Sequence, residues 1–251
     1  MRIGQLHGVG FAGVGLGEVL PEVRIFDVPF LFRTDQEIDK VYNQLDEYFA
    51  LEYDKKGYIL LGWIPVGWVH MFSTRKIESV SDLVKSKPWV WEGEFLAQET
   101  YKALGVNPVP LAITDVLMSL QTGIINSIYA SSQGVLALQW FTQAKYMNAL
   151  RMSHAVGGVL ISKRKFGKIS KQHQQVILDL SKKHFKNLAK KINQDNQLSI
   201  KILKRNGMQV IPMLSDLEEE KFRAAGKQAR KNLVGRLFSK NLLDQVLVSL
   251  D

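Results

Sequence analysis

The sequence predicts an α/β protein in which short strands alternate with helices. Within 87–132, two apolar runs are each followed by a helical spacing, and a third apolar run ends the segment. The three runs are 89–91, 106–111 and 124–130. Alternation with short connections is typical of a parallel sheet covered by helices, in which ligands bind outside the carboxyl ends of the strands. Residues 92–94 and 130–133 are therefore expected near a binding site.

Length and composition agree with one large domain or two small lobes that bury a sizeable core. The 251 residues are 46% hydrophobic and 23% charged, and their formal net charge is +9. Much of the positive charge lies along one predicted helix within 163–205, without an RNA-binding signature or zinc spacing. A solvated helix face is therefore favoured over a role in binding nucleic acid. The absence of cysteine excludes disulfides and thiolate chemistry, and it is compatible with cytoplasm or periplasm.

The first motif is Gly8-x-Gly10-x-x-Gly13, the pattern that brings a dinucleotide pyrophosphate close to a helix N-terminus. Two further glycines follow where a helix should begin, so a regular first helix is not expected. Asp27 lies too close to serve as the ribose-binding acid of that motif. A flexible loop at the edge of a lobe is the favoured interpretation, and a dinucleotide-dependent enzyme is kept as an alternative.

Capping signals predict the shorter helices. Thr34 and Glu37 form a capping box for a helix that reaches about Leu51, and Ser215 with Glu218 forms a second box before another helix. Two more helices are expected at 136–146 and 242–250.

The longest predicted element begins at Ser170 and runs without proline or glycine to Asn206. At 1.5 Å per residue its length is about 50 Å, which exceeds a single small lobe. We therefore expect this helix to brace two lobes. The extended segments 57–72 and 154–162 are expected to cross between those lobes as strands.

Three segments then carry a resemblance to a known family. They are Trp-Val-Trp-Glu-Gly-Glu-Phe-Leu-Ala at 89–97, Lys-Ala-Leu-Gly-Val-Asn-Pro-Val-Pro-Leu at 102–111 and Asp-Val-Leu-Met-Ser-Leu-Gln-Thr-Gly-Ile-Ile-Asn at 115–126. They resemble the solute-binding subunit of tripartite ATP-independent periplasmic (TRAP) transporters, and the resemblance covers most of the chain. It implies a two-lobed periplasmic-binding-protein-like fold with a long hinge-spanning helix. Such a protein closes on a small molecule and delivers it to membrane permease subunits, with no chemical reaction and no cofactor.

The resemblance also implies where the lobes and their partners lie. Lobe 1 is expected at 1–67 and 156–196, lobe 2 at 68–155 and 197–251, and the ligand cleft between them. A helical-repeat lipoprotein is a further candidate partner, and nucleic acid is not expected. Family members carry a signal peptide and further strands before the segment that matches 1–6. We therefore expect lobe 1 to lack its N-terminal part, Met1 to be internal to a longer precursor, and the native protein to be periplasmic.

The ligand class is predicted from three positions where the resemblance implies polar anchors. The carboxylate-binding members carry arginines where this sequence has Val90 and Val69, and an asparagine where it has Ala130. A buried carboxylate without a partner costs several kcal/mol, so a dicarboxylate, sialic acid or acid sugar is disfavoured. The chain is assigned to an aromatic-rich branch that lacks the usual arginine, and an apolar or amphipathic ligand is expected. An organic acid held by an unusual contact is kept as an alternative.

Aromatic residues lie within two positions of all three anchors and are candidate pocket walls. Strand alternation places Trp89 and Trp91 opposite Val90, so a role in the core for some of these rings is kept open. Glu92 and Gln133 are candidate polar contacts. The expected substrate-binding set is Trp68, Val69, Trp89, Val90, Trp91, Glu92, Tyr129, Ala130 and Gln133.

No catalytic or metal-binding residue is expected. The five histidines are scattered, and neither a P-loop nor a nucleophile elbow is present. His70 is expected to be a core histidine with its hydrogen bonds made, in preference to a cleft residue.

Overall fold

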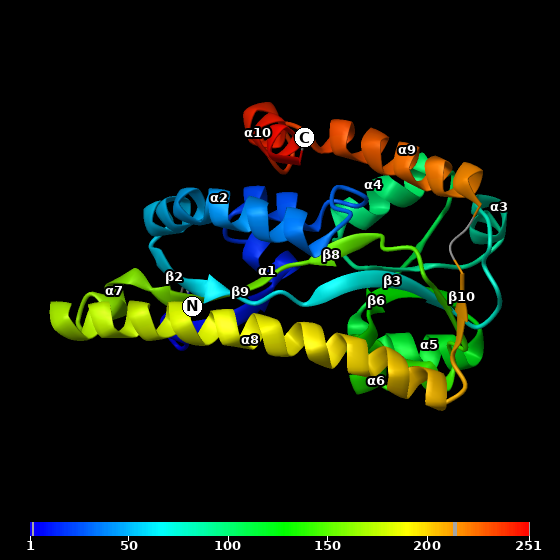
Figure 1. The fold of residues 1–251 in the computed structure, drawn as a ribbon, viewed down its shortest axis with the longest axis horizontal. Coiled ribbons are helices and arrows are strands. Elements are labelled where there is room, and N and C mark those ends of the chain that lie inside the picture. The colour runs from blue at the N-terminus through cyan, green and yellow to red at the C-terminus, as the bar shows by residue number, and fades with distance from the viewer. Residues whose placement is uncertain (2, 213–214, 251) are drawn as a thin grey trace.

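The computed structural model describes residues 1, 3–212 and 215–250, and it has two lobes, each built on its own β-sheet (Figure 1). The first lobe contains a three-stranded antiparallel sheet in the order β1-β9-β2. Its strands are β1 (Gly8–Ala12), β2 (Tyr58–Trp63) and β9 (Gly157–Ser162). The second lobe contains a five-stranded sheet of β3 (Gly67–Ser73), β6 (Ser127–Ser131), β7 (Tyr146–Asn148), β8 (Ser153–Ala155) and β10 (Gln209–Ile211).

A short parallel pair completes the second lobe. β4 (Trp89–Trp91) pairs in parallel with β5 (Val109–Leu111), which confirms the parallel arrangement expected for the first two apolar runs. The third run forms β6, which pairs antiparallel with β3 and touches the β4 segment through one parallel bridge between Pro88 and Ser127. The expected parallel sheet is therefore present only in part.

Helices cover both sheets. The structure contains α1 (Gly13–Gly17), α2 (Asp35–Lys55), α3 (Val80–Val84), α4 (Phe95–Ala103), α5 (Val116–Thr122), α6 (Ser132–Ala137), α7 (Lys163–Phe166), α8 (Lys171–Arg205), α9 (Asp216–Leu233) and α10 (Lys240–Leu250). Three 3-10 helices are η1 (Pro21–Asp27), η2 (Ile113–Asp115) and η3 (Trp140–Thr142). None of the helices in the described part of the chain combines the length and the apolar character needed to cross a bilayer.

The capping signals are confirmed at three helix starts. The Thr34 hydroxyl accepts a hydrogen bond from the Glu37 backbone N–H at the start of α2, and the Glu37 carboxylate accepts from the Thr34 backbone N–H. Ser170 caps α8 by accepting from the His173 N–H, and Ser215 caps α9 by accepting from the Glu218 N–H. The expected second box is present only in half, because the Glu218 carboxylate accepts from the Val80 N–H and not from Ser215. The expected helix at 136–146 is wrong, because this segment contains the end of α6, then η3 and the start of β7.

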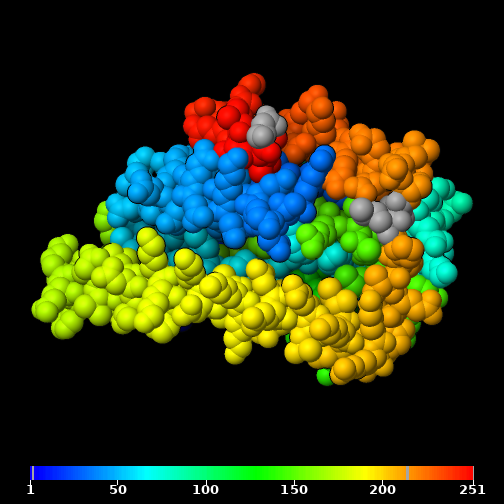
Figure 2. All heavy atoms as spheres, viewed as in Figure 1, coloured from blue at the N-terminus to red at the C-terminus, as the bar shows by residue number. Residues whose placement is uncertain are grey.

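The long helix α8 has 35 residues and lies along both lobes, as expected (Figure 1). It contacts β2 in the first lobe and α6 and β3 in the second. Figure 2 shows it as a continuous ridge along one edge of the molecule. Most of its surface is exposed, which agrees with a solvated face for its many lysines.

Two crossings join the lobes beside α8. The single strand expected over 57–72 is split into β2 and β3, because the chain bends at Gly67, whose φ is +113°. Asn196 of α8 donates a hydrogen bond to the Val66 carbonyl (2.9 Å) and so holds this crossing. The return segment is split in the same way, at Val156 between β8 and β9.

The C-terminal helices pack on different lobes. α9 packs against α4 in the second lobe, whereas α10 packs against α2 in the first. Leu242 and Val246 of α10 are buried in one cluster with Val41 and Leu45 of α2. The expected division placed the whole segment 197–251 in lobe 2, and the packing of α10 differs from it. The exact lobe boundaries stay a prediction.

Candidate ligand-binding site

A cavity of about 250 Å³ lies where the two lobes meet. The first lobe contributes residues from β1, α1 and η1, and the second contributes residues from β4, α4 and β6. The segment 152–156, which leads to the return crossing, closes a further side. The lining is largely apolar, and its charged residues are Arg24, Asp27 and Glu94.

Four aromatic rings form one wall of this cavity. Trp89 stacks on Tyr129 with ring centroids 5.2 Å apart, and the Trp140 ring meets Trp89 edge-on at 5.5 Å. Trp91 lies 6.2 Å from Trp89, and its backbone N–H donates to the Tyr129 hydroxyl (3.4 Å). The indole N–H of Trp89 donates to the Leu111 carbonyl, so its polar atom is satisfied away from the cavity. The rings therefore present apolar surface.

Five of the nine residues expected from the sequence line this cavity. They are Val69, Trp89, Trp91, Tyr129 and Ala130. Two strands bring four of these residues together. Trp89 and Trp91 share one face of β4, because successive side chains of a strand point to opposite faces, whereas β6 contributes the neighbouring residues Tyr129 and Ala130 near its carboxyl end. That they bind a ligand stays a prediction.

The other four expected residues lie elsewhere. Val90 is buried on the opposite face of β4, in a cluster with Leu104 and Val106, because it alternates with the two tryptophans. The indole N–H of Trp68 donates to the Asp35 carboxylate (2.6 Å), and its ring packs against the core of the first lobe.

Glu92 and Gln133 are both exposed and outside the cavity. Glu92 follows the last residue of β4 in a turn, and Gln133 donates its backbone N–H to the Asn196 side chain on α8.

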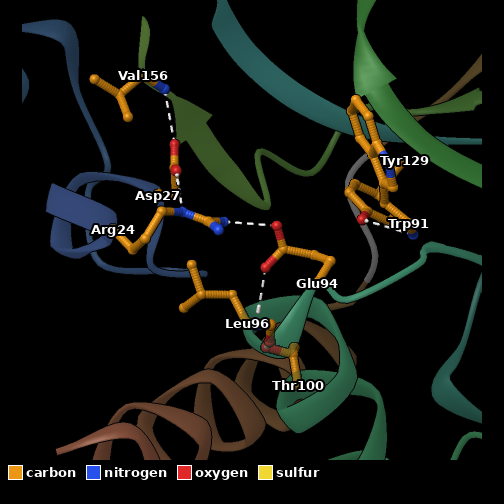
Figure 3. Close-up of polar contacts among 8 residues, drawn as sticks. All are labelled: Arg24, Asp27, Trp91, Glu94, Leu96, Thr100, Tyr129 and Val156. Atoms are coloured by element: carbon orange, nitrogen blue, oxygen red, sulfur yellow. Dashed lines mark hydrogen bonds and ion pairs between the residues drawn. The ribbon is translucent and has the colours of Figure 1, made fainter. Parts of the chain in front are cut away.

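A buried ion-pair cluster of Arg24, Asp27 and Glu94 lies across the meeting point of the lobes (Figure 3). Arg24 is only 8% exposed. Its Nε–H donates to Oδ2 of Asp27 and its Nη2–H donates to Oε2 of Glu94, both at 2.7 Å. Arg24 and Asp27 belong to η1 of the first lobe, whereas Glu94 precedes α4 of the second. The Arg24–Glu94 pair therefore joins the two lobes directly.

Backbone donors fix both carboxylates of the cluster. Oδ1 of Asp27 accepts from the N–H of Val156 (2.7 Å), in the return crossing. Oε1 of Glu94 accepts from the N–H of Leu96 (2.9 Å), so Glu94 is also the N-cap of α4. The two carboxylates are thus held in place from opposite sides of the guanidinium, as Figure 3 shows.

Burial and charge compete in setting the proton affinities of this cluster. Burial raises the pKa of Asp27 to about 6, against the opposing effects of Arg24 and the Val156 N–H. Burial alone would lower the pKa of Arg24, but the nearby charges of Asp27 and Glu94 raise it above its ordinary value. Arg24 therefore stays charged near pH 7.

Glycines of α1 make room for the cluster. A Cβ on Gly17 would lie 2.9 Å from the Cγ and Cδ atoms of Arg24, and a Cβ on Gly13 would collide with the Asp27 carboxylate. The expectation of a flexible loop at 8–13 is wrong, because Gly8–Ala12 pairs along its length with β9. Gly13, the third glycine of the G-x-G-x-x-G pattern, therefore leaves room for the Asp27 side chain. The pattern gives no support to a dinucleotide site.

Tyr101 adds one polar atom that has no partner. Its side chain lines the cavity and is 2% exposed, and its hydroxyl makes no hydrogen bond with the residues that the structure describes. Leaving a buried hydroxyl unpaired is unfavourable. The hydroxyl itself is enclosed, so a ligand would pair with it only after a neighbouring side chain had moved.

His70 and His154 lie outside the cavity lining. His70 is 7% exposed, and its Nδ1 lies 3.1 Å from the Asn148 carbonyl oxygen, which confirms it as a buried core histidine. His154 is also buried, and burial lowers the pKa of both imidazoles to about 4. Both rings are therefore neutral near pH 7.

Arg24, Asp27 and Tyr101 were not predicted as site residues, and Glu94 was expected near the site only as part of 92–94. One local signal for the first two was present: Arg24 and Asp27 flank Ile25 and Phe26 in an otherwise apolar segment. Their pairing with Glu94 joins residues 70 positions apart and could not be inferred without the fold.

The two lobes are joined by crossing strands and have an aromatic cavity between them. This arrangement is that of the bacterial solute-binding proteins. Within this class, the chain belongs to the bacterial extracellular solute-binding proteins of family 7, whose model matches residues 1–236. Family membership confirms the expectation of a binding protein in place of an enzyme.

Curated relatives and solved structures agree with this assignment. The 2,3-diketo-L-gulonate-binding periplasmic protein of Escherichia coli is 25% identical over 227 residues, covering 89% of this chain and 66% of that protein. The ectoine/5-hydroxyectoine-binding periplasmic protein of Ruegeria pomeroyi is 24% identical, with 87% of this chain and 66% of that protein covered. This chain thus spans just under two thirds of the length of these relatives.

The solved structures confirm the two-lobed fold. A TRAP periplasmic solute-binding protein from Polaromonas, bound to D-erythronate, superposes with a TM-score of 0.87 at 24% identity, covering 98% of this chain and 80% of that chain. Another from Chromohalobacter salexigens, bound to D-glucuronate, has a TM-score of 0.89 at 19% identity, covering 99% of this chain and 82% of that chain.

Proposed function

We propose that this protein is the solute-binding subunit of a TRAP transporter that captures an apolar or amphipathic small molecule by closure of its lobes. The cavity carries this proposal, because its wall is aromatic and aliphatic. Its charged lining residues within the described part of the chain, Arg24, Asp27 and Glu94, are paired with one another. Val69, Trp89, Trp91, Tyr129 and Ala130 would contact the ligand.

The partners and the compartment follow from the same assignment. Both relatives described above are periplasmic by name, so the proposed location of this protein is the periplasm. The closed, loaded protein would deliver its ligand to the membrane permease subunits of the transporter. Docking on a helical-repeat lipoprotein stays a prediction.

The surface of the cavity favours an apolar or amphipathic ligand. A large aromatic ring can bury about 150 to 250 Å², and the Trp89–Tyr129 stack presents such surface on one wall. Val69 and Ala130 add aliphatic surface from β3 and β6. An amphipathic ligand could also pair its polar end with the Tyr101 hydroxyl. These features support assignment to an aromatic-rich branch without the usual carboxylate-binding arginine.

An organic-acid ligand is the second candidate, and Arg24 favours it. This arginine lines the cavity, and a guanidinium is the side chain that binds carboxylates in bidentate fashion. Solved relatives bind acids such as D-erythronate and D-glucuronate. In this chain, however, an acid would have to compete with Glu94 for the guanidinium.

Native mass spectrometry of the protein purified from cells tests the proposal. We expect a bound apolar or amphipathic compound, recovered by organic extraction and released by Trp91→Ala but not by Trp63→Ala, because Trp63 lies outside the cavity. Micromolar binding of succinate or sialic acid, with no competition from an apolar compound, would overturn the proposal.

A further inference from the structure

We propose that Glu94 sets the charge selectivity of the cavity, by occupying Arg24 and by leaving the cluster with a net negative charge. Glu94 would thereby exclude carboxylate ligands and favour an amphipathic ligand whose polar end carries an ammonium or N–H donor. This inference rests on the proposed binding function and adds the chemistry of the ligand's polar end.

The first step is that Arg24 is already engaged on two sides. Its Nε–H and Nη2–H donate to Asp27 and Glu94 at 2.7 Å. Each carboxylate is fixed in turn by a backbone N–H, from Val156 and from Leu96. To bind Arg24, a ligand carboxylate would therefore have to displace Asp27 or Glu94, each of which is itself a carboxylate already held in place.

The second step is the charge of the cavity. Among its lining residues there are two carboxylates, Asp27 and Glu94, and one guanidinium, Arg24, so their formal sum is −1 when both carboxylates are ionised. The surrounding wall is aromatic and aliphatic, and charges interact more strongly in such surroundings than in water. A ligand carboxylate would be the third carboxylate in the cavity and would be repelled there, whereas an ammonium or amide N–H group would be attracted.

The third step is that the cluster joins the lobes. Glu94 belongs to the second lobe and Arg24 to the first, so the pair forms where the lobes meet. A ligand that disturbs this pair would also disturb one of the contacts between the lobes. A ligand that leaves the pair intact keeps that contact.

Replacing Glu94 by glutamine isolates the charge. A glutamine has the same shape, and its Oε1 can still cap α4 by accepting from the Leu96 N–H. The formal charge of the cluster would rise from −1 to zero, and one side of Arg24 would become free for a ligand carboxylate. Glu94→Ala serves as a second variant that removes the side chain altogether.

The matched control is Glu99→Gln. Glu99 lies on α4 close to Glu94, but it pairs with Arg236 of α9 (3.0 Å) and does not line the cavity. The substitution makes the same change of charge within α4, the helix that Glu94 caps. Circular dichroism and thermal denaturation check that all variants are folded.

The probes are three compounds of matched shape, namely 3-phenylpropanoate, 3-phenylpropanamide and 3-phenylpropylamine. Isothermal titration calorimetry at pH 7.5, above the pKa of Asp27, gives their dissociation constants. We expect wild type and Glu99→Gln to bind the amine and the amide at least tenfold more tightly than the carboxylate. In Glu94→Gln and Glu94→Ala, the ratio of amine to carboxylate affinity should fall at least tenfold.

The outcomes separate this inference from the proposed function. If the amide binds and the ratio falls less than tenfold in both Glu94 variants, the inference is overturned and the apolar cavity stands. If no phenyl compound binds to any protein, the apolar ligand class is overturned, and titration with D-glucuronate and pyroglutamate decides the inference. A tenfold gain in affinity for these acids in Glu94→Gln then supports it, and a smaller gain overturns it.

Discussion

Gly13 approaches Asp27 so closely that a Cβ atom on Gly13 would lie 2.0 Å from Oδ2 of Asp27. No heavy atom can remain at that distance from a carboxylate oxygen to which it is not bonded. Asp27 cannot move away freely, because its two oxygens are bound to Arg24 and to the Val156 N–H. The glycine is thus a requirement of the ion-pair cluster.

Replacing Gly13 by alanine should therefore destabilise the protein by about 1 to 3 kcal/mol, the usual effect of forcing a methyl group into a filled interior. Urea denaturation measures the loss. Gly10→Ala is the matched control within the same motif, because its Cβ would lie 3.9 Å from the nearest atom, Cγ2 of Val159. Equal effects of the two substitutions would contradict this role of Gly13.

Arg24→Met should destabilise the protein more strongly, because it leaves the carboxylates of Asp27 and Glu94 buried without their partner. Breaking one side of a buried ion pair costs about 3 to 5 kcal/mol. Adding Asp27→Asn and Glu94→Gln to Arg24→Met should restore a large part of this free energy of unfolding, as measured in urea. A loss below 1 kcal/mol for Arg24→Met alone would show that the cluster is not a coupled unit.

Tyr101 and Tyr42 offer a paired test of ligand contact. Both hydroxyls are buried and have no hydrogen-bond partner among the described residues, but only Tyr101 lines the cavity. Removing an unpaired buried hydroxyl should raise the free energy of unfolding by about 1 kcal/mol in both Tyr101→Phe and Tyr42→Phe. Calorimetric titration with 3-phenylpropanamide should then show weaker binding in Tyr101→Phe only. Equal affinities in the two variants would rule out a ligand contact at the Tyr101 hydroxyl.

Stability should decrease as the pH falls from 7 to 4.5. Burial lowers the pKa of His70 and His154 to about 4, so the stability they contribute is complete above their unfolded value of about 6.5 and is lost as the pH falls through this window. Asp27 acts in the opposite sense, because its pKa is raised to about 6 and its contribution is lost as the pH rises. The loss from two histidines exceeds the gain from one aspartate. The free energy of unfolding should therefore fall by about 3 kcal/mol between pH 7 and pH 4.5.

Urea denaturation at several pH values measures this dependence. His154→Phe should make it shallower, because one of the two histidines no longer titrates. A wild-type stability that is unchanged or higher at pH 4.5 would contradict the neutral state of these buried rings.

The parts of the fold that were predicted are those encoded by local chemistry. The Thr34–Glu37 box and the Ser170 cap mark helix starts through contacts three residues apart, and the structure contains both. The helix expected at 136–146 failed because Gln139 adopts a left-handed conformation (φ +57°), which ends α6 and which no glycine announces. The strand expected at 57–72 failed at Gly67, where the bend depends on Asn196 of a distant helix.

The candidate site was predicted only in part. Trp89, Trp91 and Tyr129 were named because each lies next to an anchor position that the family resemblance implies, and all three line the cavity. Val90 was placed in the site through a resemblance at one position, although the alternation of β4 turns it to the opposite face.

The cluster of Arg24 and Glu94 could not be found, because it depends on how two lobes meet. The sequence showed no arginine at the expected anchors, and the cavity nevertheless contains one that enters from the other lobe.

The position of β9 between β1 and β2 also determines when the first sheet can form. In that sheet Gly8 pairs with Ile161, and Leu60 pairs with Leu160, so both outer strands wait for a partner that follows much later in the chain. During synthesis the first sheet cannot form until the segment up to Ser162 has been made. Pairing over such sequence distances slows folding, because a long loop must be closed before any contact is gained. A nascent chain of this topology therefore keeps the apolar residues of β1 and β2 unpaired until β9 has been made.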